Sequence, residues 1–308
     1  MLRPTLLRAS RSSRLRTAIE ANRISRGVVA RFVAGEDAAD AITAVEKVHR
    51  QGMMTSLDVL GEDVTDLASA RHVRDQYLSL LFRLHQAGQA ARSEVSLKLS
   101  ALGQRLPGGG HDLALRHARE ICVAADAVDC RVTLDMEDHT TVDSTLAIGI
   151  ELRTEFPLTA NVLQANLKRT HDDIAALSRS GARVRLVKGA YREPKDVAYQ
   201  RKSDVDDAYQ SGIRMLMASS CYPMIATHDP FMIREAANLA DRFNRTSEDW
   251  EVQMLFGIGS GLRRELLNAG RRVRVYVPFG EDWYGYFMRR LAERPANVAF
   301  FLRALAKG

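Results

Sequence analysis

The segment 185–191 (RLVKGAY) joins a short β-branched run to charged residues at the point where a strand would leave a sheet. Because side chains alternate along a strand, Arg185, Val187 and Gly189 would share one face. An arginine on an inner face needs a partner, since an unpaired buried charge is prohibitive. A bound anion or a polar ring system would be such a partner, and Gly189 would let a ligand approach the backbone closely.

Eight segments, this one included, are short apolar runs bounded by turn residues and separated by stretches of helical length. They cover residues 53–61, 95–103, 132–137, 158–164, 184–190, 223–228, 252–258 and 273–280. Eight strands alternating with helices are typical of an α/β fold, the (β/α)8 TIM-type barrel. The length from about Val45 onward suits the roughly 250 residues of that fold. An open doubly wound sheet is the alternative, but no G-x-G-x-x-G motif follows any of the runs.

Polar residues stand at the ends of these predicted strands, where such barrels collect their functional groups while branched apolar side chains fill the interior. They are Asp58, Glu62, Lys98, Asp135, Glu137, Gln164, Arg185, Lys188, His228, Gln253 and Tyr276. Lys98 is the most unusual, because lysine is seldom buried in a strand without a function. Asp135, Glu137 and His139 are potential metal ligands, but the pattern is equally typical of acids at a helix N-terminus. We therefore expect no metal site.

A final helix is expected to begin near Asp282, a suitable N-cap, and to carry Arg289 and Arg290. Adjacent residues lie roughly 100° apart around a helix, so the two guanidinium groups can flank one target. A carboxylate is the natural target because it matches the planar guanidinium fork. By itself the pair is weak evidence, since charged residues late in a helix more often face solvent.

Composition indicates a folded chain without a membrane span. Of its 308 residues, 46% are hydrophobic, and no apolar run reaches the length of about 18 residues that a transmembrane helix needs. Cys122, Cys130 and Cys221 are too few and too scattered for a disulfide framework or a zinc site. This cysteine pattern favours a reducing compartment.

Positive charge is concentrated at the N-terminus, where residues 1–34 carry eight arginines and a single acid, Glu20. We expect residues 1–44 to form a basic helical arm, with a composition change near Gly35, and residues 45–308 to form the barrel. A transit peptide or a patch for anionic lipid has a similar composition. Nucleic-acid binding is disfavoured, because the basic residues lack interleaved aromatic residues for stacking on bases.

Taken together, the strand-end motifs resemble the proline dehydrogenase family. The matching motifs are VSLKLS at 95–100, LDME at 134–137, QA at 164–165, RLVKGAY at 185–191, ATH at 226–228, QMLFG at 253–257, YVP at 276–278 and RRL at 289–291. Their order along the chain makes the resemblance specific, and the chain length resembles the monofunctional bacterial type. Four residues depart from common family choices, namely Asn166, Arg192, Asp229 and Val252.

The resemblance implies a distorted barrel that holds FAD and oxidises L-proline to Δ1-pyrroline-5-carboxylate by hydride transfer to flavin N5. The residues implied to bind the proline carboxylate are Lys98, Arg289 and Arg290. Those implied to line the pocket are Asp135, Tyr191, Leu255 and Tyr276, with Glu62 pairing with Arg289 over the substrate. Those implied to contact FAD are Gln164, Arg185 (near N5), Val187, Gly189, Ala190, Thr227, His228, Gln253 and Glu293.

A quinone electron acceptor, a partner that consumes the product and a cytoplasmic location, peripheral at the inner membrane face, also follow from the resemblance. The mitochondrial matrix is the alternative location. The alternative activity is a Schiff-base aldolase or transaldolase, with Lys98 or Lys188 as the nucleophile. A metal-dependent barrel hydrolase is weaker, because no His-x-His follows the first strand. The residues do not identify a base for the substrate amine.

Overall fold

The computed structural model describes residues 27–293, in which eight parallel strands close into one barrel in chain order. The strands are β1 (Met54–Val59), β2 (Ser93–Leu97), β3 (Arg131–Leu134), β4 (Ala160–Gln164), β5 (Arg183–Val187), β6 (Tyr222–Ala226), β7 (Glu251–Leu255) and β8 (Val273–Phe279). Strand β1 pairs with both β2 and β8, which closes the sheet. The predicted barrel is confirmed.

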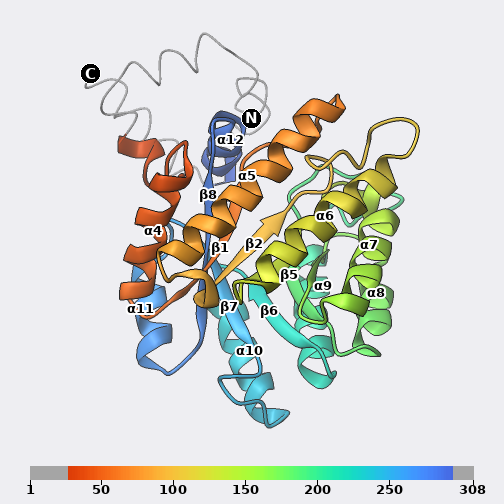
Figure 1. The fold of residues 1–308 in the computed structure, drawn as a ribbon. Helices are drawn as coiled ribbons and strands as arrows, with labels where there is room; N and C mark the ends of the chain where they lie inside the picture. Colours follow the sequence, from red (N-terminus) through yellow and green to blue (C-terminus); the bar gives the residue numbers. More distant parts are fainter. Residues whose placement is uncertain (1–26, 294–308) are drawn as a thin grey trace.

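Helices follow the strands and surround the barrel (Figure 1). They are α5 (Leu67–Gln86), α6 (Gly110–Asp126), α7 (Val142–Glu155), α8 (Thr170–Ser178), α9 (Lys202–Ala218), α10 (Pro230–Arg242), α11 (Ser260–Asn268) and α12 (Trp283–Glu293), while α4 (Ala38–Arg50) precedes β1. Asp37 caps α4 by accepting hydrogen bonds from the backbone N–H groups of Ala39 and Asp40. Helix α4 runs continuously through residues 44 and 45, where the arm was expected to give way to the barrel.

The barrel departs from a regular outer ring of helices at the join between its first and last strands. Helix α4 packs against β1 and β8, whereas α12 continues from the end of β8 (Figure 1). Helix α12 instead packs against the segment that precedes α4, in an aromatic cluster that includes Phe32, Trp283 and Phe287. Trp283 also donates a hydrogen bond to Glu36. The end of the expected N-terminal arm therefore anchors the helix that carries Arg289 and Arg290.

The interior of the barrel is polar, which is the reverse of the expected apolar filling. In β8, Val273, Val275 and Val277 pack outward against the helices, whereas Arg274 faces inward and is almost fully buried. In β2, Val95 and Leu97 pack outward in the same way. The hydrophobic core therefore lies mainly between the sheet and the surrounding helices, and a charged network fills the barrel.

Each predicted run overlaps its strand, and the predicted ends differ from the observed ones by at most three residues except at the second strand. It was expected over 95–103, but β2 ends at Leu97, and the chain then forms turns that contain Lys98 and Ser100. Lys98 is thus the first residue beyond the strand. Within residues 27–293, no helix combines the length and the hydropathy that crossing a membrane requires. Residues 1–26, most of the expected arm, lie outside the described part of the chain.

Candidate functional site

Lys98 and Asp58 form a buried ion pair where β1 and β2 end. The Lys98 ammonium donates to the Asp58 carboxylate at 2.5 Å, and the Asp58 side chain is 1% exposed. Burial raises the pKa of Asp58, and the nearby Asp135 carboxylate raises it further, while Lys98 opposes both effects. Burial by itself lowers the pKa of Lys98, but Asp58 and Asp135 raise it overall, so Lys98 remains an ammonium group.

Asp135, the first residue after β3, connects three strands. It accepts hydrogen bonds of 2.8 Å from the Ser96 hydroxyl, the Arg185 guanidinium and the Tyr276 hydroxyl. Burial is the main reason that the pKa of Tyr276 lies well above its usual value, and the Asp135 charge adds to it. Tyr276 is therefore a neutral donor. The structure thus brings together four residues that the sequence singled out, namely Lys98, Asp135, Arg185 and Tyr276.

Arg185 has four hydrogen-bond partners within the chain. One nitrogen of its guanidinium donates to Ser96 and Asp135, and the other donates to Ser56 and, at 2.5 Å, to Glu94. The Glu94 and Asp135 carboxylates supply the charge that a buried arginine requires, and a ring system as a further partner of Arg185 stays a prediction.

Glu94 is the centre of an ion-pair network below Arg185. Its carboxylate, which is completely buried, also lies 3.1 Å from Arg183 and 3.6 Å from Arg274. Arg274 in turn pairs with Glu251 at 2.7 Å. Burial opposes ionisation of Glu94, but the three arginines outweigh it and hold the pKa of Glu94 well below its usual range. Counting the Lys98–Asp58 pair, on which Asp135 acts through its charge, the group comprises four cations and four carboxylates.

Loops at the rim of the barrel are fastened to one another by carboxylates. Glu137 accepts hydrogen bonds from the backbone and hydroxyl of Ser100, and the same hydroxyl accepts from the backbone N–H of Asp63. Next to Asp63, the Glu62 carboxylate lies 3.5 Å from the Tyr191 hydroxyl. The loop after β1 is thus positioned against the loops after β2, β3 and β5.

His139 pairs with Glu193 at 2.5 Å, so it does not join Asp135 and Glu137 in a metal site. Among the described residues, no group of three or more histidine, cysteine or acidic side chains is arranged to hold a metal ion. Lys188 faces outward, where it pairs with Asp206 at 2.5 Å. An outward lysine with an acidic partner is a poor candidate for a Schiff-base nucleophile inside the barrel.

The residues expected to contact a cofactor lie along the ends of β4 to β7. Gln164 donates to the carbonyl of Glu137 at 2.7 Å, and Gln253 donates to Glu251 at 2.6 Å inside the barrel. The ring of His228 accepts from the backbone of Leu255 at 2.9 Å. The other members at these ends are Val187, Gly189, Ala190 and Thr227, of which Thr227 is buried and Ala190 exposed.

Arg290 lies on α12 with its guanidinium 5.1 Å from the centre of the Tyr286 ring. This contact stabilises a cation through the electrons of the ring. The side chains of Arg289 and Glu293 lie outside the described residues, so their expected roles stay predictions. Their backbones belong to the same helix α12.

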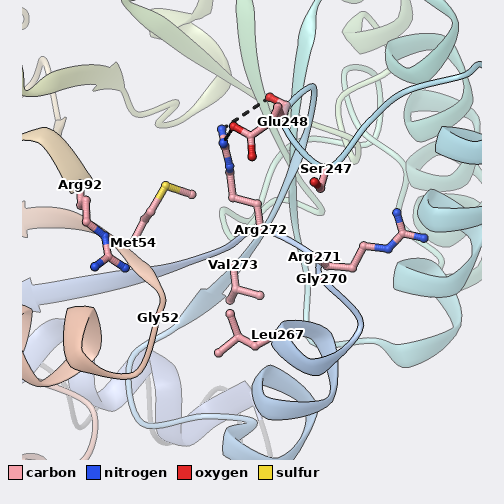
Figure 2. A pocket seen from close by; sticks show the side chains of 10 residues that line it. All are labelled: Gly52, Met54, Arg92, Ser247, Glu248, Leu267, Gly270, Arg271, Arg272 and Val273. Carbon is pink, nitrogen blue, oxygen red and sulfur yellow. Dashed lines mark hydrogen bonds and ion pairs between the residues drawn. The ribbon is translucent and has the colours of Figure 1, made fainter.

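A cavity of about 260 Å³ lies at the opposite end of the barrel (Figure 2). Its lining includes Met54 and Val273, which begin β1 and β8, and Arg92, Arg271 and Arg272. The three arginine head groups point in different directions in Figure 2, and Arg272 pairs with Glu248. Because barrel active sites form at the carboxyl ends of strands, this cavity is separate from the candidate site.

The family model described as "Proline dehydrogenase" matches residues 41–303 of this chain. The chain belongs to the proline dehydrogenase family. It is 40% identical to the proline dehydrogenase of Deinococcus radiodurans over 280 residues, covering 90% of each protein. It is 38% identical to proline dehydrogenase 1 of Bacillus subtilis strain 168 over 277 residues, again covering 90% of each. The expected family and enzyme class are confirmed.

Solved structures support the same fold. Proline utilization A from Bdellovibrio bacteriovorus, inactivated by N-propargylglycine, superposes with a TM-score of 0.82 at 24% identity, covering 87% of this chain and 33% of that one. A proline utilization A mutant from Bradyrhizobium japonicum gives a TM-score of 0.74 at 25% identity, covering 91% and 32%. The chain therefore spans about a third of the length of these two proteins.

Sequence reasoning missed the residues inside the barrel that form hydrogen bonds and ion pairs beneath the candidate site at the strand ends. They are Ser56, Glu94, Ser96, Arg183, Glu251 and Arg274. A signal was present, because polar residues recur at every second position, with Glu94 and Ser96 in β2 and Lys98 directly after it.

Proposed function

We propose that this chain oxidises L-proline to Δ1-pyrroline-5-carboxylate, with FAD as the hydride acceptor at the carboxyl end of the barrel. The observation that carries the proposal is the linked group of Lys98, Asp135, Arg185 and Tyr276, which a proline dehydrogenase family barrel presents at its strand ends. A lysine, a tyrosine and acidic side chains there suit a small ligand with one negative and one positive group.

The residues at the ends of β4 and β5 fit a flavin. Asn166 Oδ1 and Arg185 Nε are buried polar atoms without a hydrogen-bond partner in the described structure. A flavin ring system offers both donors and acceptors along its polar edge, so it could pair with an unsatisfied acceptor and with an unsatisfied donor. Gly189 has a φ of 102°, and a Cβ there would meet Asn166 Oδ1 at 2.0 Å, so the backbone leaves no room for a side chain at this edge.

We propose that FAD is held by the residues expected from the sequence: Gln164, Arg185, Val187, Gly189, Ala190, Thr227, His228, Gln253 and Glu293. When bound, FAD supplies the two-electron acceptor that the protein itself lacks. Arg185 supplies a fixed positive charge near the reacting edge of the flavin, where it would favour the reduced, anionic form. Its hydrogen bonds to Glu94 and Asp135 fix that charge in position.

We propose that the proline carboxylate is bound by Lys98, Arg289 and Arg290. Tyr191, Leu255 and Tyr276 would line the ring, and Glu62 would close over the substrate with Arg289. Placing three cations against one carboxylate fixes the orientation of a small ring, which contributes to rate through proximity. Tyr276 would crowd a substituent at C4 of the ring, so proline should be preferred to hydroxyproline.

Electrons are proposed to pass to a quinone, and the basic N-terminal segment to assist contact with a membrane surface at the cytoplasmic face. The product would pass to an enzyme that oxidises Δ1-pyrroline-5-carboxylate. Relatives of 28% identity named "Bifunctional protein PutA", such as that of Escherichia coli K12, match this chain over 24% of their length. The word "bifunctional" in that name indicates two activities in those proteins. This is compatible with a second enzyme activity that acts on the product of this chain.

The test is an anaerobic titration of the purified protein with L-proline. We expect a yellow protein whose flavin absorption is bleached by L-proline and restored faster by a soluble quinone than by dioxygen. Hydroxyproline at the same concentration is the matched control and should bleach it more slowly. A colourless protein that takes up no FAD, and that borohydride traps covalently with a carbonyl substrate, would overturn the proposal in favour of an aldolase.

A further inference from the structure

Oxidation at C5 of proline requires a neutral ring nitrogen, because the nitrogen lone pair forms the C=N bond as the hydride leaves. Proline in neutral water carries a protonated secondary ammonium and a carboxylate. The site must therefore remove a proton from the amine before or during hydride loss. This requirement rests on the proposed function. It means that a group of the chain must accept the proton of the substrate amine.

The charge of Lys98 is already matched when the substrate arrives. Its ammonium lies 2.5 Å from the Asp58 carboxylate, which is buried at the end of β1. A second carboxylate placed at Lys98 would compete with Asp58 for the same ammonium group, which is unfavourable in a buried site even with Arg289 and Arg290 nearby. The unfavourable charge disappears if Asp58 takes up one proton.

We propose that Asp58 accepts the proton of the substrate amine through Lys98. Lys98 passes a proton along its hydrogen bond to the Asp58 carboxylate and receives the proton of the proline ammonium at the vacated position. The bond that breaks is the amine N–H, and the bond that forms is O–H on Asp58. The products are neutral amine, Lys98 ammonium and neutral Asp58, so the charge of the complex is unchanged and Lys98 is released to hold the substrate carboxylate.

Other acids of the network are poorer acceptors because permanent charges bind them. Asp135 accepts a hydrogen bond from the Arg185 guanidinium, which cannot give up its proton. Glu94 faces three guanidinium groups, which hold its pKa low. Asp58 instead faces a lysine, whose proton can be transferred. Glu137 accepts hydrogen bonds from the backbone and hydroxyl of Ser100, and Lys98 acts on it only through its charge.

The groups around Asp58 come from four elements. Lys98 faces it from the end of β2, Asp135 from the end of β3 and Tyr276 from β8, and Tyr77 of α5 is close enough for the Asp58 charge to raise the pKa of that phenol. Glu62 acts on Lys98 from the loop after β1. Burial and Asp135 raise the pKa of Asp58, which is the direction that a proton acceptor at neutral pH requires.

A ligand without an amine proton tests this step without turnover. Tetrahydrofuran-2-carboxylate has the ring and the carboxylate but cannot supply a proton, so Asp58 should draw one from solvent as the ligand binds. We expect an uptake of about one proton per ligand at about pH 8, measured by calorimetry of the flavin-loaded protein in buffers of different ionisation enthalpy. No net uptake by the unaltered protein would overturn the proposal, whatever the variants do.

The variant Asp58→Asn removes the acceptor and nearly preserves its volume. It should bind the same ligand with no proton uptake, and uptake equal to that of the unaltered protein would contradict the role of Asp58. For L-proline, kcat/KM should fall about 10²- to 10⁴-fold at neutral pH and recover as the pH rises, because free proline then arrives deprotonated. Circular dichroism and flavin content establish that the variant is folded.

Asp173→Asn is the matched control, because it removes a carboxylate that pairs with Arg169 on the outer helix α8. Its proton uptake and its pH profile should equal those of the unaltered protein. If the unaltered protein fails to oxidise proline, the proposed function fails. If it oxidises proline and Asp58→Asn shows the same rate at every pH, only the present inference fails.

Discussion

The Arg185 guanidinium and the Glu94 carboxylate lie 2.5 Å apart at the centre of the barrel, and both side chains are almost completely buried. Arg183 and Arg274 contact the same carboxylate from β5 and β8. A buried ion network of this kind depends on complete pairing, because each charge has lost its water. Glu94 therefore sets both the stability of the barrel and the position of the arginine expected beside the flavin.

Replacing Glu94 with Gln should destabilise the fold by about 3–5 kcal/mol, since three guanidinium groups lose their shared buried carboxylate. The free energy of unfolding from urea titration measures this change. Asp143→Asn is the control, because Asp143 pairs with Arg169 at an exposed site, where a loss of about 0–1 kcal/mol is typical. Equal losses in the two variants would mean that the central network does not stabilise the fold.

Acid should unfold the protein through the same network. The pKa values of Glu94 and Glu251 are lowered in the folded state, although burial opposes the shift, because arginines surround both carboxylates. A lowered pKa contributes stability that is complete above the unfolded value, near 4.5, and is lost as the pH falls below it. The free energy of unfolding, measured from neutral pH downward, should therefore decrease once the pH falls below about 4.5. In Glu94→Gln the drop should be shallower, and parallel curves would contradict the assignment.

Tyr276→Phe should weaken proline oxidation. The substitution removes the 2.8 Å hydrogen bond to Asp135 and leaves that partly buried carboxylate with one donor fewer. Hydrogen bonds to charged groups contribute about 1.5–3 kcal/mol, so kcat/KM for L-proline should fall roughly tenfold to a hundredfold. Tyr284→Phe on α12 is a comparison outside this network. Unchanged kinetics in Tyr276→Phe would show that the hydroxyl does not help to shape the pocket.

Arg290→Met should raise the KM for L-proline by about tenfold to a hundredfold, because a charge-assisted contact to the substrate carboxylate contributes roughly 1.5–3 kcal/mol. Steady-state kinetics at saturating acceptor measure the change. Arg264→Met on α11 removes an equal charge elsewhere and should leave KM unaltered. The role would be excluded by an Arg290 variant with the KM of the unaltered protein.

The sequence predicted the barrel well because each β-branched run is bounded by turn residues. Lys98 stood out because lysine is rare in strands. Glu94 escaped notice because the second strand was expected to begin at Val95, two residues late. That Glu94 meets Arg183 and Arg274 depends on how β2, β5 and β8 face one another across the closed sheet, which a single strand does not reveal. The same geometry supplies Arg185 with two carboxylate partners from the chain.

Gly189→Ala should weaken FAD binding. A Cβ at this position would lie 2.0 Å from Asn166 Oδ1, at a backbone φ of 102° that non-glycine residues rarely adopt. Strain of this kind costs about 1–3 kcal/mol, so the Kd for FAD should rise at least about fivefold, measured by quenching of flavin fluorescence. Gly270→Ala has a similar backbone, with φ of 70° and open space around the new Cβ, and should keep the Kd of the unaltered protein. Adding Asn166→Ala to Gly189→Ala should relieve the contact between the new Cβ and Oδ1 of Asn166. The same change removes Oδ1, the buried acceptor proposed to face the flavin. A Kd unchanged in Gly189→Ala would place the flavin away from the β5 edge.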